Sequence, residues 1–317
     1  MTLGRKTDTT ALEVHLLREG IVESVHPVHA TVCDERGRVL LVAGSAETET
    51  FVRSALKPFQ ALCVTATGAL ERFKLSDRDL AIICSSHHGS MDQIRQTFHV
   101  LWQADLDVSV LQCPIPVGGK SSLEYNCSGK HAGMLVAAKQ MSVPLATYLR
   151  RNHPVQQLIL GKVAEILKIP SEELIVARDD CGAPTYFMQL RQMAALYARL
   201  ASGDNLDLER IVRAMVNYPD LISGEGNFDT ELMRLTQGEI VSKAGAEGIQ
   251  CIGRVKEGVG LAIKVLDGAK RAKYAVAIHL LKQMGWVSSA VVESLSDRFL
   301  MLGDFKRLEV QGELSLL

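Results

Sequence analysis

A serine and a lysine lie three residues apart in the stretch FVRSALKPFQAL (residues 51–62). Pro58 follows the lysine, and proline is tolerated only in the first helical turn, where the amides lack intrahelical partners. A helix is therefore expected to start near Ser54, with the hydroxyl one turn from the amine of Lys57. A desolvated lysine can take the proton of a serine and make it a nucleophile. A serine N-cap beside an exposed lysine explains the same spacing, and from this motif alone the N-cap is the favoured interpretation.

A second polar cluster, SSHHGS (residues 85–90), directly follows the apolar run LAIIC. The run suits a buried strand or a helical turn, and functional side chains are often presented just after such an element. Ser86 is the candidate for chemistry here. A cap for the next helix explains the cluster equally well.

Two further segments place a cysteine beside a glycine at the expected start of an element: NCSGKHAGML (126–135) and ARDDCGAPTYF (177–187). Thiolates near helix N-termini have lowered pKa values and bind soft metals. Cys127 and Cys181 are thus candidates for a shared zinc, with Lys130, His131 or Asp179 completing a tetrahedron. The spacing is not a C-x-x-C signature, and two structural cysteines explain it more simply.

The fourth candidate is SKAGAEG (residues 242–248) at the end of an expected strand. The glycine after Lys243 removes a side chain, so that backbone and ammonium can approach a substrate together. An ordinary strand followed by a turn fits as well. The polar loop in YPDLISGEGNFDTELM (218–233) is best explained as a surface loop.

The composition favours a protein that binds a small molecule. The 317 residues are 47% hydrophobic and 22% charged with a net charge of −1, which does not favour binding to nucleic acid or an anionic membrane. The seven cysteines are scattered and do not indicate a disulfide framework. We expect no signal peptide in the first twenty residues and no membrane span, and hence a cytoplasmic protein.

The pattern of elements predicts an α/β (α+β) protein. The first 45 residues favour strands, with a hairpin formed by HATVCD and RVLLVAG, and residues 91–217 favour helices, including one over YFMQLRQMAALYARLA. Strands return after residue 236 and are followed by a helix over AKYAVAIHLLKQMG. We expect a single domain, 1–317, with an antiparallel sheet lobe at about 1–85 and 236–317 and an all-helical lobe at about 90–235.

The order S-x-x-K, second serine, K-x-G resembles the arrangement of β-lactamases and penicillin-binding proteins. The resemblance to the bacterial asparaginase II family is closer and runs from about residue 13 to beyond residue 280. Departures such as Glu19 and Ala244 touch no proposed catalytic group. Seven blocks occur in the family's order: REGIVESVHPVH, RSALKPFQAL, SSHHGS, CSGKHAGML, DDCGAPTY, GNFDTELM and KAGAEGIQC.

This resemblance implies a fold like that of the serine β-lactamases and penicillin-binding proteins, and hydrolysis of L-asparagine to L-aspartate and ammonia. It implies two Ser–Lys tandems, Ser54 with Lys57 and Ser86 with Lys243, of which we favour Ser54 as the nucleophile. It also implies a Zn²⁺ ion and a homodimer. The implied metal ligands are Cys127, Lys130 and Cys181, and the weaker candidates for substrate binding are Arg53, Asp179, Asp180, His131 and Glu247.

Three alternatives remain from the sequence. One is a glutaminase on the same scaffold, and another is a penicillin-recognising enzyme. The third is of a different class, a zinc- or amino-acid-binding protein without turnover.

Overall fold

The computed structural model describes residues 9–316, so the expectation about a signal peptide lies partly outside the described residues. The chain divides into two compact units, each built from separate segments. The first, here called the sheet unit, contains residues 9–55, 188–202 and 231–316 of the described chain. The second, here called the helical unit, contains Leu56–Phe187 and Gly203–Thr230.

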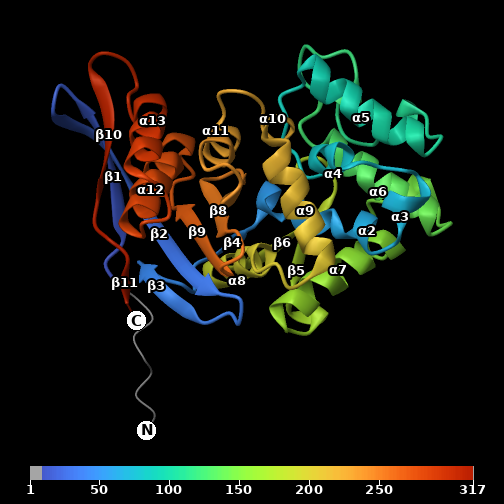
Figure 1. The fold of residues 1–317 in the computed structure, drawn as a ribbon, viewed down its shortest axis with the longest axis horizontal. Helices are drawn as coiled ribbons and strands as arrows, with labels where there is room; N and C mark the ends of the chain where they lie inside the picture. Colours follow the sequence, from blue (N-terminus) through green and yellow to red (C-terminus); the bar gives the residue numbers. More distant parts are fainter. Residues whose placement is uncertain (1–8, 317) are drawn as a thin grey trace, which may run out of the picture. The chain divides into compact units, whose positions relative to one another are not determined.

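Figure 1 labels the strands and helices along the chain. The strands are β1 (Leu12–Arg18), β2 (Ile21–Asp34), β3 (Val39–Ala43), β4 (Glu49–Phe51), β5 (Ile175–Arg178), β6 (Pro184–Gln189), β7 (Ile240–Ala244), β8 (Ile249–Arg254), β9 (Val259–Val265), β10 (Lys306–Gln311) and β11 (Ser315–Leu316).

The longer helices are α4 (Asp77–Ile83), α5 (Met91–Gln103), α6 (Ser128–Gln140), α7 (Pro154–Leu167), α8 (Leu190–Ala201), α9 (Leu206–Asn217), α11 (Phe228–Leu235), α12 (Lys270–Gln283) and α13 (Ser289–Phe299). Single α-helical turns form α1 (Lys57–Gln60), α2 (Leu62–Thr65), α3 (Ala69–Arg72) and α10 (Pro219–Ile222). The 3₁₀ turns are η1 (Arg53–Leu56), η2 (Val108–Val110), η3 (Ser122–Glu124), η4 (Leu145–Thr147) and η5 (Ser171–Glu173).

The sheet unit contains an eight-stranded sheet in the order β10-β1-β2-β9-β8-β7, with β3 pairing both β2 and β11. Every pair in it is antiparallel. The predicted hairpin is confirmed, because β2 and β3 pair from Ala30 opposite Ala43 to Cys33 opposite Val39. Strands from both ends of the chain therefore meet in one sheet, as the sequence indicated.

The centre of this sheet is covered on both faces. Successive strand residues point to opposite faces, and every residue from Gly260 to Val265 of β9 is buried. Helices α8 and α12 both contact this strand. On the α8 side, a Cβ at Gly260 would lie 2.2 Å from the carbonyl oxygen of Ala194, so glycine is what lets the helix approach so closely.

The helical unit is built around α6. Helices α2, α4, α5 and α7 all contact it, and α4 also contacts α9. The residues from Ser128 to Ala138 of α6 are all buried. Two small strands in the same unit, β5 and β6, form an antiparallel hairpin from Ile175 opposite Phe187 to Arg178 opposite Pro184.

Several expectations about elements were wrong. The expected helix over residues 186–201 begins only at Leu190, because Tyr186–Gln189 belong to β6 and pair in part with β5. The hairpin of β5 and β6 means that the middle of the chain is not purely helical. The sequence patterns also missed α13, although Val291, Leu295 and Phe299 recur at helical spacing; only Leu295 of this helix is buried.

The prediction of one domain stays a prediction, but the contacts divide the chain differently from the expected lobes. Residues 56–85 lie in the helical unit rather than with the sheet, because α2 and α4 pack on α6 and α9. Residues 188–202 lie in the sheet unit, because α8 packs on β2, β8 and β9. Packing partners far along the chain decide these assignments.

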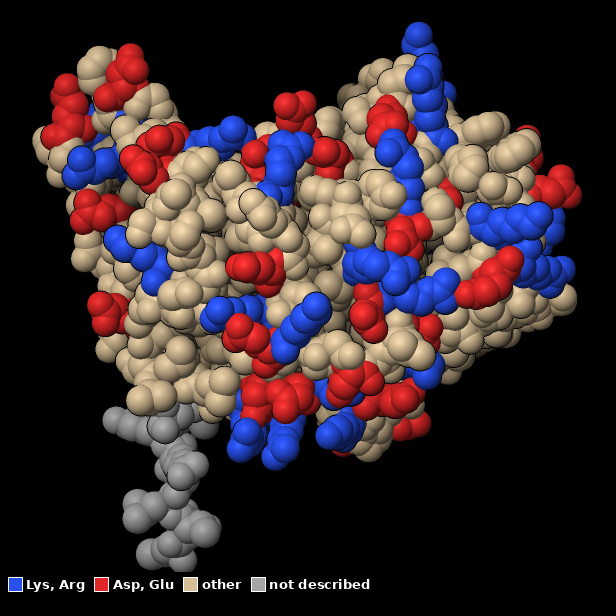
Figure 2. Space-filling model, viewed as in Figure 1, with Lys and Arg blue, Asp and Glu red and all other residues tan. Residues whose placement is uncertain are grey.

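Within the described residues, no helix combines the length and the apolar character that a membrane crossing needs. Figure 2 shows that basic and acidic side chains are interspersed over the face drawn. This mixture agrees with the net charge of −1.

Candidate active site

Lys57 begins α1 and is completely buried, although its side chain ends in an amine. Its Nζ donates to the carbonyl oxygen of Ser85 at 2.5 Å, to Ser86 Oγ at 2.9 Å and to the carbonyl oxygen of Asn126 at 3.0 Å. Burial lowers the pKa of Lys57, and the nearby ammonium of Lys130 acts in the same direction. These effects outweigh the neighbouring thiols, which act to raise the pKa.

The three partners of Lys57 differ in what they can do. The carbonyl oxygens of Ser85 and Asn126 can only accept hydrogen bonds, whereas the hydroxyl of Ser86 can also donate one. A neutral amine can therefore donate to both carbonyls and direct its lone pair at the Ser86 hydroxyl. The hydroxyl of Ser86 is thus placed where it can exchange a proton with the amine of Lys57.

Ser86 is positioned by the end of α4. The helix ends at Ile83, and the Ser86 amide donates to the carbonyl of Ile222 at 2.7 Å. Ser90 forms a capping box with Gln93 at the start of α5. The cluster SSHHGS thus contains the predicted helix cap, at Ser90, and a hydroxyl at Ser86 that contacts the buried amine of Lys57. The predicted pairing of Ser86 with Lys243 stays a prediction.

His87 is held as a neutral ring. Ser128 donates its hydroxyl to the Leu123 carbonyl and accepts from Nε2 of His87 at 2.8 Å, while the Gly89 amide donates to Nδ1 at 3.1 Å. Burial lowers the pKa of His87 to about 3, and the charges of Lys57 and His88 add to this. Because both ring nitrogens are occupied, we assign His87 a structural role rather than proton transfer.

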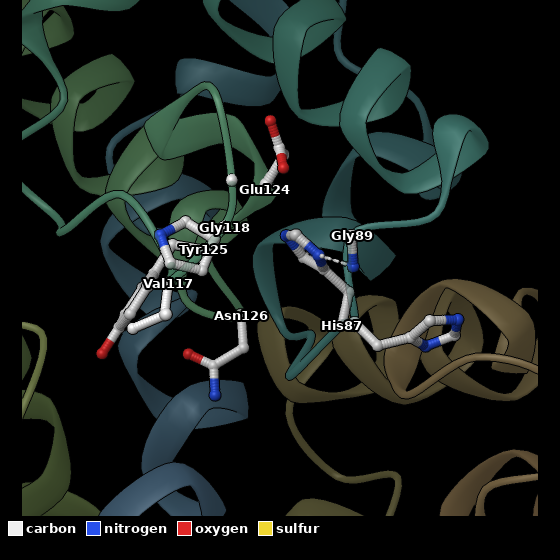
Figure 3. A pocket seen from close by; sticks show the side chains of 10 residues that line it. His87, Gly89, Val117, Gly118, Glu124, Tyr125 and Asn126 are labelled. Carbon is white, nitrogen blue, oxygen red and sulfur yellow. Dashed lines mark hydrogen bonds between the residues drawn. The ribbon is translucent and has the colours of Figure 1, made fainter.

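A cavity of about 500 Å³ lies beside this group in the helical unit. Figure 3 shows its wall, in which the ring of His87 and the side chains of Tyr125 and Asn126 come from different segments. The loop Pro116–Gly119 and the carboxylate of Glu124 complete the lining. The cavity therefore adjoins Asn126, whose carbonyl receives the amine of Lys57.

The second group in the helical unit contains Cys127, Lys130 and Cys181, all of which are buried. Lys130 lies in the first turn of α6 and donates to the Cys181 sulfur at 3.1 Å. A hydrogen bond from Cys181, together with the positive charges of Lys57 and Lys130, holds the pKa of Cys127 well below its usual value despite burial. The fold thus brings together the three predicted metal ligands.

The protonation of this group follows from its pairing. The pKa of Cys181 is raised, because this thiol donates to Cys127 and is buried. Burial lowers the pKa of Lys130, but the negative charges of Cys127 and Asp179 and the hydrogen bond to Cys181 outweigh it, and the pKa is raised overall. Without a metal ion, the favoured state is an ammonium beside a thiolate.

The chemistry of the donors suits a soft divalent ion, since two sulfur atoms and an amine are ligands that zinc accepts. No group of three or more His, Cys, Asp or Glu side chains within residues 9–316 is arranged to hold a metal. A metal at Cys127 and Cys181 would therefore need Lys130 as its third ligand, and the amine would have to lose its proton to bind.

Ser54 and Lys243 lie in the sheet unit. Ser54 belongs to the 3₁₀ turn Arg53–Leu56 rather than capping α1, whose N-cap position is Leu56 with no side-chain cap. Arg53, directly before it, has a left-handed backbone with φ of 51°. Such a conformation is costly for a non-glycine residue and is often found at functional sites.

Two contacts fix the Ser54 segment. The hydroxyl of Tyr197 in α8 donates to the Ala55 carbonyl at 2.8 Å. A Cβ at Gly245 would lie 3.0 Å from the carbonyl oxygen of Val52, so the turn after Lys243 packs closely against the residues before Ser54. Lys243 itself is buried at the end of β7 and donates to the Ala244 carbonyl at 2.9 Å. The sheet unit thus brings the turn after Lys243 close to the residues before Ser54.

The other predicted substrate-binding residues lie in several places. Asp179 and Asp180 form the turn between β5 and β6, beside Cys181. His131 is buried in α6 with Nδ1 2.6 Å from the Tyr148 hydroxyl, and it does not line the cavity. Glu247 lies in the turn between β7 and β8 with a left-handed φ of 54°. Their contacts with a substrate stay predictions, as does the contact predicted for Arg53.

Sequence reasoning missed the wall of the cavity. Tyr125 and Asn126 stand directly before the predicted cysteine, but neither was chosen as a site residue. Burial raises the pKa of Tyr125 to about 12, so its phenol can donate a hydrogen bond at neutral pH. The breaks at Pro116 and Gly118–Gly119 marked a loop in the sequence, yet spacing alone gave no sign that it lines a cavity.

Solved structures share low similarity with the chain. Mglu in its L-glutamate binding form is 14% identical with a TM-score of 0.40, over 82% of this chain and 61% of that one. A β-lactamase from Mycobacterium bovis is 11% identical with a TM-score of 0.41, over 86% of this chain and 95% of that one. The chain thus spans about 61% of the length of Mglu. These TM-scores are too low to carry an argument.

The sequence itself gives a stronger result. No curated protein shows a significant match. The family model described as L-asparaginase II, however, matches residues 14–316, which is nearly the whole chain and includes each of the seven sequence blocks. The chain therefore belongs to the L-asparaginase II family of hydrolases.

Proposed function

We propose that the protein hydrolyses the side-chain amide of L-asparagine to L-aspartate and ammonia through a covalent ester on Ser54. The observation that carries this proposal is the buried amine of Lys57, which lies 2.9 Å from the Ser86 hydroxyl beside a cavity of about 500 Å³. Burial lowers the pKa of this amine, which favours the neutral form that a base requires. Membership of the L-asparaginase II family supports the choice of amide.

In the proposed first step, the Oγ–C bond forms between Ser54 and the amide carbon while the serine proton passes to Lys57. The C–N bond then breaks, and the proton is delivered to the leaving nitrogen, which departs as ammonia. Ser86 lies within hydrogen-bonding distance of Lys57 and relays this proton. Lys243 then takes a proton from the water whose oxygen bonds to the ester carbon, the C–Oγ bond breaks, and the proton returns to Ser54 Oγ as L-aspartate leaves.

We also propose that Cys127, Lys130 and Cys181 hold a Zn²⁺ ion. When bound, such an ion supplies a positive charge that polarises or orients a substrate. The three side chains hold the ion, and Lys130 must give up its proton when the ion binds. Zinc per chain, measured on the purified protein, tests this proposal without an activity assay.

The function is tested by measuring ammonia release from asparagine and from glutamine, with nitrocefin turnover as a third assay. We expect asparagine to be the best substrate. Preferred turnover of glutamine or nitrocefin would instead identify a glutaminase or a penicillin-recognising enzyme. No turnover of any of the three would leave the binding-protein alternative.

The nucleophile is tested with Ser54→Ala and Ser86→Ala. Ser54→Ala should abolish turnover and leave folding and zinc content unchanged, because removing a nucleophile costs up to about 10⁶-fold in kcat. A diazoketone analogue of asparagine, followed by peptide mass mapping, should label Ser54. A label on Ser86, or full activity in Ser54→Ala, would contradict the assignment. Ser109→Ala, an exposed serine distant in sequence, is the control.

The cytoplasmic location and the homodimer stay predictions. The mass of the protein in solution tests the second of these directly.

A further inference from the structure

Three lysines of the sheet unit converge on the turn between β7 and β8, residues 244–249, which we call the lysine turn. Lys243 Nζ donates to the Ala244 carbonyl at 2.9 Å. Lys264 Nζ donates to the Glu247 carbonyl at 2.6 Å. Lys273 Nζ donates to the carbonyls of Gly245 at 2.7 Å and Ile249 at 3.1 Å.

Lysine amines thus bind four carbonyls of the lysine turn, and backbone amides complete its hydrogen bonding. The Gly245 amide donates to the Ile249 carbonyl, and the Gly248 carbonyl accepts from the amide of Val265. Lys273 binds the two residues that close the turn, Gly245 and Ile249, and so fixes the distance between its ends. At the tip, glycine suits the left-handed φ of 73° at Gly248, whereas the φ of 54° at Glu247 is costly for a non-glycine residue and is supported by the contact of its carbonyl with Lys264.

Lys273 is an unusual residue for its position. It lies on α12 with 3% of its surface exposed, among the buried apolar residues Ala272, Ala275 and Val276. Burying an ammonium costs far more than burying an apolar side chain, unless its hydrogen bonds are made. Packing alone would therefore favour an apolar residue here, and the contacts with the turn account for the lysine.

The lysine turn directly follows Lys243 and packs against the residues before Ser54. Lys243 immediately precedes the turn, and Gly245 packs against the carbonyl of Val52. A shift of the turn therefore displaces the amine of Lys243 relative to the Ser54 segment. Displacements of about 1 Å can cost about 10²-fold in rate.

We propose that Lys273 is a positioning residue, with Lys264 as a second anchor: its ammonium clamps both ends of the lysine turn and thereby orients Lys243 for the hydrolytic step. The catalytic half of this inference rests on the proposed function. The anchoring half does not, and it can be measured without a substrate.

The experiment compares Lys273→Met with Lys270→Met, which removes an exposed lysine one turn earlier on the same helix. Hydrogen exchange of the amides of Gly245 and Ile249 should become about 10- to 100-fold faster in Lys273→Met, which loses charged hydrogen bonds, and should stay unchanged in Lys270→Met. For asparagine, kcat should fall about 10- to 100-fold with KM within about twofold of the wild type. Lys273→Arg, which keeps the donors, should recover part of the kcat.

Unchanged exchange in Lys273→Met would overturn the anchoring. Faster exchange with an unchanged kcat, or an equal loss of kcat in Lys270→Met, would overturn the positioning role. If the wild type itself hydrolyses no amide, the proposed function fails, whereas the exchange rates still decide the anchoring. If Lys273→Met does not fold, Lys264→Met makes the same comparison at the middle of the turn, through the single contact with Glu247.

Discussion

Helices α6 and α7 have 13 and 14 residues and pack against each other, but they differ in how many of their faces are buried. In α7 the buried residues, such as Val155, Ile159 and Val163, recur every four positions, and Lys162 reaches Glu165 at the surface. In α6 the residues from Ser128 to Ala138 are buried on every face. An amphipathic helix can leave its polar groups in water, whereas a helix buried all round cannot.

Each polar group on α6 therefore needs a partner inside the protein. Ser128 joins His87 to the Leu123 carbonyl, and Lys130 meets Cys181. His131 meets Tyr148 through one ring nitrogen, while the other is buried without a partner in the described chain. The comparison teaches that a helix with no solvent-facing side must hold its polar groups against other segments of the protein, as Ser128, Lys130 and His131 are held.

The largest predicted effect is on zinc affinity, when one lysine is replaced in each helix. Lys130→Met should weaken zinc binding by more than the about 10- to 100-fold that loss of an outer partner costs, because the proposed third ligand is removed. Lys162→Met in α7 should leave zinc binding unchanged, since its ion pair with Glu165 lies at the surface. Metal titrations of both variants measure this, and equal zinc affinity in the two would end the proposed role of Lys130.

Adding one methyl group to α6 should be the next largest effect. A Cβ at Gly129 would lie 2.0 Å from the carbonyl oxygen of Ile82 in α4. Although alanine is the better helix former, we expect Gly129→Ala to lower the free energy of unfolding by about 3 kcal/mol, because α4 must move away. Urea denaturation measures this change in free energy. A variant as stable as the wild type would show that α6 and α4 are not in close contact at Gly129.

The neutral ring of His87, which Ser128 of α6 holds, should make the free energy of unfolding depend on pH. The pKa of His87 is about 3 in the folded protein and near 6.5 when unfolded, so the unfolded state binds more protons as the pH falls below 6.5. The wild type should therefore lose about 2 kcal/mol of unfolding free energy from this residue between pH 7 and pH 5. His87→Gln should lack this loss.

His88→Gln, which changes an exposed ring next in sequence, is the matched control for the pH experiment. It should keep most of the pH dependence of the wild type, because burial is the main cause of the lowered pKa of His87. If His87→Gln and the wild type respond to pH in parallel, the ring of His87 is not held neutral by its surroundings.

The smallest effect should come from α7, with the opposite sign to that in α6. A Cβ at Gly161 would meet no atom within 4 Å, so Gly161→Ala adds helix propensity without a clash. We expect a gain of about 0.5 to 1 kcal/mol in unfolding free energy. A loss of stability would remove the contrast between the two helices.

Much of the secondary structure could be predicted from the sequence, because it depends on local periodicity. The strands β7, β8 and β9 and the helices α5, α9 and α12 follow their patterns closely. The helix predicted over Tyr186–Gln189 was wrong, because these residues belong to β6 and pair in part with β5. The helix α13 was missed because it was assigned to a polar tail, although its apolar residues Val291, Leu295 and Phe299 recur at helical spacing.

The chain by itself determined which reactive residue types are present and, through its seven blocks, the family to which they belong. Pro58 fixed the start of α1 at the residue before it. Only the tertiary structure decided that Lys57 meets Ser86, that Lys130 meets Cys181 and that Lys273 meets Gly245. These partners are 29, 51 and 28 residues apart, and contacts at such separations are set by the packing of helices and strands rather than by local spacing.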